Sequence, residues 1–186
     1  MNHFFVTGLP RSRTAWLANF LTWQGTFCYH DALSFLSPTD MVMRFKSLTL
    51  CDTVGDSDSA LTLHMSAITR FFPDANWLFV VREPELASSS YWRRFGSKYP
   101  LGPQTESECD RRFMELQERL EQAMEMVSNK MVVKYDRLHL RGTVGTIWEY
   151  LVGTPFQEER WKMLETFQVN VIASKVRLAK TICLQS

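Results

Sequence analysis

The sequence predicts an α/β fold, with a mainly parallel sheet and helices on both of its faces. Short apolar runs of strand length alternate along the chain with longer segments whose apolar residues recur at helical spacing. This alternation is typical of parallel sheets, because a helix must carry the chain back before the next parallel strand can begin. Ligands of such sheets bind beyond the carboxyl ends of the strands, so we expect the functional residues there.

Length and composition indicate a single domain over residues 1–186. Of the 186 residues, 45% are apolar and 22% are charged, and the formal net charge is +1. These values are ordinary for a globular protein and predict neither a nucleic-acid partner nor a membrane partner. Four widely spaced cysteines argue against a zinc site and against a disulfide framework. Because the sequence has no apolar run of about 18 residues and no signal-like run, we expect a cytoplasmic protein.

The first segment of the chain combines a strand, a turn and a helix. An apolar run at residues 4–6 is followed by a turn at residues 7–10 and by a helical pattern at residues 14–21. A helix N-terminus just beyond a strand presents backbone N–H groups to an anion, and a phosphate suits such a place. The turn and the start of the helix add the donor side chains of Arg11, Ser12, Arg13 and Thr14. This segment therefore predicts an anion-binding site.

Two strands and two helices are predicted next. They are expected at residues 26–29 (strand), 38–48 (helix), 47–54 (a range that contains a strand) and 60–72 (helix). Ser37 is a favoured N-cap residue and Pro38 is favoured at the first helical position, so the first of these helices begins there. Residues 55–59, of sequence Gly-Asp-Ser-Asp-Ser, are predicted to form a turn after the second strand.

The second half of the chain is predicted to contain two strands and four helices. The strands are expected at residues 77–81 and 131–135, and the helices from residue 84, through residues 113–127, around residues 144–151 and at residues 157–167. Residues 91–106 are predicted to form a loop, because glycine and proline interrupt them. The aromatic and basic side chains of this loop suit a lid or an acceptor-binding wall, or simply a surface connection.

A second candidate anion site follows the strand at residues 77–81. Arg82 stands at the end of this strand, Pro84 opens the following helix, and Ser90 comes eight residues after the arginine. An arginine and a hydroxyl at a second strand-to-helix turn add to the evidence from the first, because each motif alone is short.

Both motifs resemble those of the sulfotransferases, which bind 3′-phosphoadenosine 5′-phosphosulfate (PAPS). The string G-L-P-R-S-R-T-A-W-L at residues 8–17 resembles the family's 5′-phosphosulfate loop, P-[KR]-S-G-T, with Arg13 in place of the glycine. Arg82, Pro84 and Ser90 match the family's R-x-P-x-x-x-x-x-S motif. The resemblance extends from residue 4 to residue 167 and implies a P-loop NTPase-like sulfotransferase architecture. The kinase P-loop differs, because it needs a second glycine followed by a lysine.

The resemblance implies how the residues hold the cofactor. Arg11 and the loop N–H groups would hold the 5′-phosphosulfate, and Arg82 with Ser90 would hold the 3′-phosphate. Tyr135 and Trp16 would lie beside the adenine. The full set of implied cofactor residues is Gly8, Pro10, Arg11, Ser12, Arg13, Thr14, Ala15, Trp16, Arg82, Ser90, Tyr135 and Phe167. The R-K-G triplet that completes the 3′-phosphate site in the cytosolic branch is missing from the tail.

Sulfuryl transfer also requires a group that takes the acceptor's proton. Asp31 is the first candidate for this base, because it follows a strand close to the place of the glutamate of the tyrosyl-protein branch. Asp56 and Asp58 are the next candidates and lie in the predicted turn, where a helix-capping role is expected more strongly than a catalytic one. His64 resembles the histidine of the cytosolic branch, but it is predicted to pack inside a helix. Arg11 is expected to act in catalysis by holding the sulfuryl group.

The predicted activity is transfer of a sulfuryl group from PAPS to a hydroxyl or amine of a small molecule, glycan or peptide. No metal is expected, since the sequence shows no cluster of metal-binding residues and the family needs none. Two alternatives remain open. One is a nucleotide or small-molecule kinase of the same fold, and the other is an inactive nucleotide-binding or assembly protein. The sequence does not reveal the oligomeric state.

Overall fold

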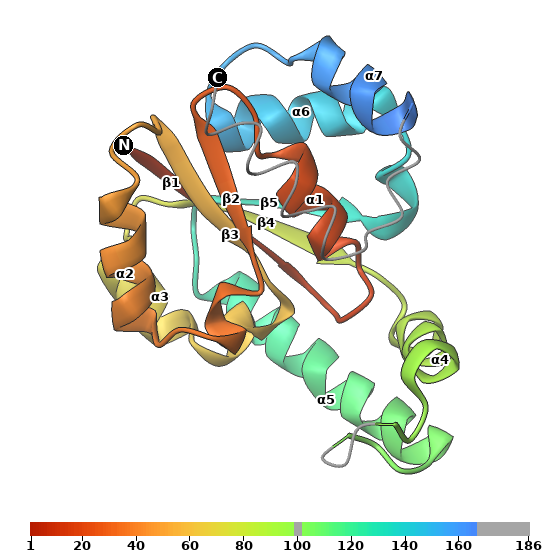
Figure 1. Ribbon diagram of the computed structural model, residues 1–186. Coiled ribbons are helices and arrows are strands. Elements are labelled where there is room, and N and C mark those ends of the chain that lie inside the picture. Colours follow the sequence, from red (N-terminus) through yellow and green to blue (C-terminus); the bar gives the residue numbers. More distant parts are fainter. Residues whose placement is uncertain (99–101, 167–186) are drawn as a thin grey trace.

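The computed structural model describes residues 1–98 and 102–166. Within these residues, five strands form one sheet in the order β2–β3–β1–β4–β5, and each strand runs parallel to its neighbours (Figure 1). The strands are β1 (Asn2–Gly8), β2 (Thr26–His30), β3 (Thr53–Ser57), β4 (Asn76–Val81) and β5 (Lys130–Lys134). The predicted α/β fold with a parallel sheet is confirmed.

Helices cover both faces of this sheet. The α-helices are α1 (Thr14–Phe20), α2 (Pro38–Ser47), α3 (Met65–Phe71), α4 (Pro84–Phe95), α5 (Glu106–Glu125), α6 (Arg141–Val152) and α7 (Glu158–Thr166), and short 3-10 helices are η1 (Ala32–Ser34), η2 (Ser59–Leu63) and η3 (Tyr135–Arg137). Helices α1, α6 and α7 cover one face, whereas α2, α3 and α5 cover the other (Figure 1). In the described part of the chain, no helix is long and apolar enough to cross a membrane.

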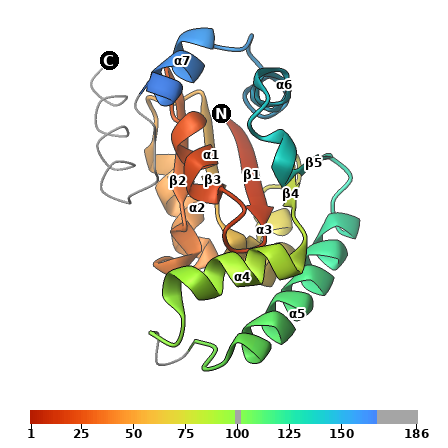
Figure 2. The same cartoon turned by 90° about the vertical axis from the view of Figure 1, so that its right-hand side faces the viewer.

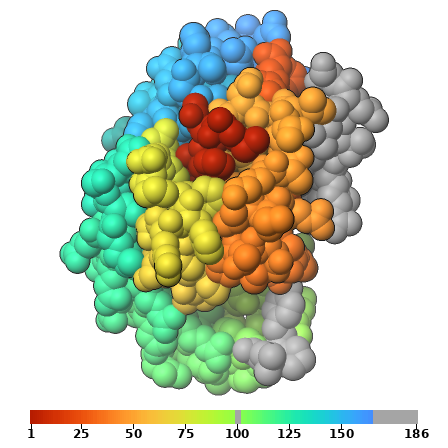
Figure 3. Space-filling view, turned by 90° about the vertical axis from the view of Figure 1, so that its left-hand side faces the viewer, coloured from red at the N-terminus to blue at the C-terminus, as the bar shows by residue number. Residues whose placement is uncertain are grey.

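Alternate residues of the central strand β1 supply both cores. Phe4 and Val6 pack with Leu17 of α1, while Phe5 packs on the other face against Trp77, with 4.8 Å between the two ring centroids. A strand that is buried on both faces has a continuous apolar sequence. This explains why the apolar run at residues 4–6 predicted a strand. The chain enters β1 at the surface between the segments that carry α2 and α3, as Figure 3 shows, and leaves it in the interior.

Helix α4 runs across the carboxyl ends of the strands, as seen in Figure 2. The predicted loop at residues 91–106 is therefore wrong in its first part, because the helix continues to Phe95. Gly96 ends it with a φ of 53°, and the Gly96 N–H donates to the Trp92 carbonyl at 2.7 Å. The Tyr91 and Phe95 rings lie 4.8 Å apart, so packing favours the helix over the turn-rich composition.

Two further element predictions differ from the structure. The turn predicted at residues 55–59 is strand as far as Ser57, because β3 lies inside the sheet between β1 and β2. Gly55 permits this position, since a Cβ there would lie 2.4 Å from the Phe4 ring. The helix predicted at residues 60–72 is broken at His64, which joins η2 to α3, so the histidine does not lie inside a continuous helix.

Candidate active site

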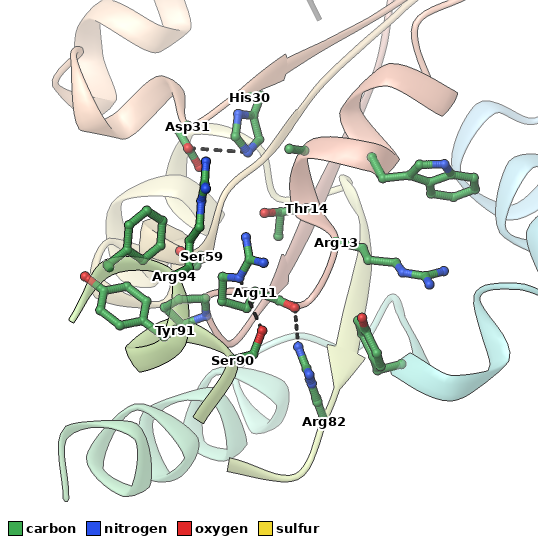
Figure 4. Close-up of a pocket in the computed structure, with 15 residues that line it drawn as sticks. Arg11, Arg13, Thr14, His30, Asp31, Ser59, Arg82, Ser90, Tyr91 and Arg94 are labelled. Atoms are coloured by element: carbon green, nitrogen blue, oxygen red, sulfur yellow. Dashed lines mark hydrogen bonds and ion pairs between the residues drawn. The ribbon is translucent and has the colours of Figure 1, made fainter. Parts of the chain in front are cut away.

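A pocket of about 850 Å³ lies at the carboxyl ends of the strands. It is lined by Pro10, Arg11, Arg13, Thr14, Ala15, Trp16, His30, Asp31, Ser59, Arg82, Ser90, Tyr91, Arg94, Phe95 and Tyr135 (Figure 4). After β1, the next strand along the chain is β2, which lies on the β3 side of β1. After β4, the next strand is β5, which lies on the opposite side of β1. The crevice between such oppositely directed connections is where open parallel sheets bind their ligands.

The loop between β1 and α1 forms one wall of the pocket. Gly8 lets the loop start close to β4, since a Cβ at this position would lie 2.5 Å from the Val80 carbonyl oxygen. Arg11 and Arg13 both adopt the left-handed backbone conformation, with φ values of 73° and 63°. Successive residues in right-handed and left-handed backbone conformations direct their N–H groups into a concave surface that binds anions.

Arg82, from the end of β4, joins this loop to α4. The Arg82 Nη1 atom donates to the Arg11 carbonyl oxygen at 2.5 Å, and Arg11 Nε donates to Ser90 Oγ at 3.4 Å (Figure 4). Tyr135 follows β5. Its ring centroid lies 4.1 Å from the guanidinium carbon of Arg82 and 5.1 Å from that of Arg13. The structure thus brings the two predicted anion motifs into direct contact.

The pocket is strongly positive. Among the described residues, Arg11, Arg13 and Arg82 form no ion pair with a carboxylate. Partial burial lowers the pKa of Arg82 from its usual value. The guanidinium groups of Arg11, Arg13 and Arg93 lower this pKa further, whereas Tyr135 raises it. Arg82 Nε is buried without a hydrogen-bond partner in the described part of the chain. Guanidinium groups in such a setting fit phosphate or sulfate oxygens, which would satisfy both their charge and their donors.

A histidine and a carboxylate face this cluster from the end of β2. His30 Nε2 lies 3.3 Å from Asp31 Oδ2, and both side chains line the pocket (Figure 4). Asp31 is also hydrogen-bonded to Asp58, whose carboxylate oxygens accept the N–H groups of Ala60 at 2.7 Å and Leu33 at 3.2 Å. Burial raises the pKa of Asp58, and its hydrogen bonds with the Ala60 and Leu33 N–H groups and with Asp31 oppose this shift.

His30 was not a candidate from the sequence. The sequence predicts only that it directly follows the strand at residues 26–29. The signal that could have identified it is its position, because His30 is the last residue of β2 and ligands of open parallel sheets bind beyond the carboxyl ends of the strands.

Several predicted residues do not line the pocket. Gly8 and Ser12 belong to the β1–α1 segment but are buried, and a Cβ at Gly8 would lie 3.3 Å from Ser12 Cβ. Asp56 is buried inside β3, and its Oδ1 lies 3.4 Å from the Ala32 N–H, so it does not stand in an open turn. His64 does not line the pocket either, although its charge acts on Asp58, which interacts with Asp31. Phe167 falls outside the described residues.

The remaining predicted cofactor residues line the pocket. They are Pro10, Arg11, Arg13, Thr14, Ala15, Trp16, Arg82, Ser90 and Tyr135. The Trp16 ring stacks on Phe20 with 5.3 Å between centroids and 6° between planes, which holds it at the rim. In the described ranges, no three His, Cys, Asp or Glu side chains are grouped so that they could hold a metal ion.

Comparison with solved structures identifies two sulfotransferases with the same architecture. The sulfotransferase domain from the curacin biosynthetic pathway matches with a TM-score of 0.59 and 11% identity, covering 86% of this chain and 77% of that one. The sulfotransferase from Alicyclobacillus acidocaldarius matches with a TM-score of 0.61 and 12% identity, covering 96% of each chain. No protein-family model and no curated protein matches the sequence. The chain therefore has the sulfotransferase fold.

Proposed function

We propose that the chain is a PAPS-dependent sulfotransferase that transfers a sulfuryl group to a hydroxyl or amine acceptor. One observation carries this proposal. The two anion motifs, which follow β1 and β4, meet in one pocket, where Arg11 contacts Ser90 and Arg82 contacts the Arg11 carbonyl. A donor with phosphate groups at both its 3′ and 5′ positions requires two anion sites that share one cavity. The sulfotransferase fold supports the same conclusion.

The residues of the pocket fit such a donor. Arg11 and the left-handed loop would hold the 5′-phosphosulfate, and Arg82 with Ser90 would hold the 3′-phosphate. Arg82 Nε, which is buried without a partner in the described part of the chain, gains an acceptor when a phosphate binds. Tyr135 and Trp16 line the same pocket and would lie beside the adenine. Arg13, in place of the family's glycine, adds a further cation.

Transfer requires in-line positioning and neutralisation of charge. The acceptor oxygen or nitrogen forms a bond to sulfur while the bond from sulfur to the phosphate oxygen breaks, and the electron pair of that bond leaves with the bisphosphate. Arg11 stabilises the charge that develops on this leaving oxygen. We assign the acceptor's proton to His30, with Asp31 positioning the imidazole through Nε2.

A transfer assay tests this proposal. The purified chain is incubated with radiolabelled PAPS or radiolabelled ATP and a panel of hydroxyl and amine acceptors. We expect labelled product from PAPS alone. His30→Gln and Asp31→Asn should each lower turnover by about 10²–10⁴-fold, the usual contribution of a general base, without weakening the binding of 3′,5′-adenosine bisphosphate. His139→Gln, at an exposed histidine outside the pocket, is the matched control and should keep full turnover.

Two other results would favour the alternatives. Label transfer from ATP would support a kinase. Bisphosphate binding without transfer to any acceptor would support an inactive nucleotide-binding protein. If His30→Gln and Asp31→Asn both retain full turnover, the assignment of the base is wrong although the activity stands.

A further inference from the structure

One end of the pocket is lined by residues to which we assign no donor contact, and there the Phe95 ring centroid lies 6.0 Å from the guanidinium carbon of Arg11. His30, Asp31, Ser59, Tyr91, Arg94 and Phe95 line this part, which we call the acceptor end. In Figure 4 it lies beyond Arg11, on the side opposite Arg13. Because the whole pocket is about 850 Å³ and must hold the donor as well, the acceptor end suits a small molecule.

Two aromatic rings form a firm wall of the acceptor end. Tyr91 and Phe95 stand one turn apart on α4, with 4.8 Å between their ring centroids, and Tyr91 also packs against Phe113 of α5 at 5.6 Å. The Ser88 hydroxyl donates to Asp110 Oδ1, which fastens α4 to α5. Neighbouring rings held in this way favour a flat aromatic guest by edge and face contacts.

Arg94 places a positive charge beside this wall. Its side chain is drawn into the pocket in Figure 4 without a hydrogen bond or ion pair to another labelled residue. Asp31, the carboxylate that lines the same end, is already held by His30. Arg93 is the adjacent arginine on α4, but it does not line the pocket, and its Nε donates to the Ser89 carbonyl. A helix C-terminus favours arginine at both positions, so only the orientation of Arg94 points to a ligand.

We propose that the acceptor is a small aromatic hydroxy acid. Its ring lies along Tyr91 and Phe95, its carboxylate pairs with Arg94, and its hydroxyl faces His30. In the reaction, the hydroxyl oxygen bonds to sulfur, the sulfur–oxygen bond to the phosphate breaks, and the hydroxyl proton passes to His30. This inference rests on the proposed sulfotransferase function, because it assumes that the donor occupies the other end.

The test compares ligands that differ only in charge. Isothermal titration measures para- and meta-hydroxybenzoate and their neutral amides against protein saturated with 3′,5′-adenosine bisphosphate. At least one of the acids should bind about tenfold or more tightly than its amide, because a hydrogen bond to a charged group contributes at least that much affinity. Arg94→Gln should reduce the affinity for the acid to that for the amide. Arg93→Gln, which removes the same charge one residue away, should leave the difference intact.

Four results would overturn the inference. The same titration is run with the saturated-ring analogue of hydroxybenzoate and with an acidic peptide that contains tyrosine. The four results are equal affinity for acids and amides, equal loss of affinity in the two arginine variants, tighter binding of the saturated-ring analogue than of hydroxybenzoate, and tighter binding of the peptide than of hydroxybenzoate. In each case the bisphosphate still binds, so the proposed function survives. If the bisphosphate itself fails to bind, the proposed function and this inference are both wrong.

Discussion

Arg11 and Arg13 adopt a backbone conformation that most residues avoid. The left-handed region costs a residue with a side chain about 1–2 kcal/mol, and glycine enters it freely. The φ of 63° at Arg13 gives a physical reason for the glycine at the corresponding place of the sulfotransferase loop. In this chain the arginine bears that cost while its guanidinium lies 5.1 Å from the Tyr135 ring centroid and lines the pocket.

Substitutions at Arg13 separate the backbone cost from the charge. Arg13→Gly relieves the left-handed strain but adds about 0.5–1 kcal/mol of unfolded-state entropy, so its stability should stay within about 1 kcal/mol of the parent. Arg13→Ala keeps the strain and should be less stable than Arg13→Gly by about 1 kcal/mol. Both variants lose the cation and should weaken bisphosphate binding equally. Urea unfolding and titration measure the two effects, and a lower stability of Arg13→Gly than of Arg13→Ala would show that the backbone is not strained.

At the scale of elements, the site depends on how closely β1 and β4 approach at their carboxyl ends. Gly8→Ala would place a Cβ 2.5 Å from the Val80 carbonyl oxygen, which forces the backbone to move. We expect a loss of about 1–3 kcal/mol in the free energy of unfolding, as for other overpacked positions. Gly142→Ala is the control, because it lies in α6 with no heavy atom within 4 Å of the added Cβ. Thermal unfolding measures the stability of both variants. Equal melting temperatures would contradict the close approach of β1 and β4.

Periodicity and capping residues predicted most elements, because these signals are local. Ser37 illustrates this, since its side chain accepts the Asp40 N–H at 3.2 Å and begins α2 as expected. The errors occur where tertiary contacts outweigh local composition. Gly55 belongs to a strand because the sheet surrounds it, and Tyr91 belongs to a helix because it packs on Phe95 and Phe113.

At the scale of the molecule, the strand order assembles the pocket. The loop between β1 and α1 and the Arg82 motif could be proposed as anion sites from the sequence, because each lies within a short stretch of residues. The pairing of these motifs with His30 could not be predicted in the same way. It depends on β2 being placed two strands away from β1, with its end facing α4 across the pocket. Strand neighbours are set by long-range packing, which local periodicity does not report.

The proposed function requires one pocket that binds phosphate groups at both the 3′ and the 5′ positions of an adenosine. Isothermal titration with 3′,5′-adenosine bisphosphate and with its isomer adenosine 5′-diphosphate tests this most directly, because the two ligands share composition and differ in phosphate position. We predict that the 3′,5′ isomer binds about tenfold or more tightly, and that Arg82→Ala removes this preference, since it deletes a charged hydrogen-bond partner of the 3′-phosphate. Equal affinity of the parent protein for the two isomers would contradict the account.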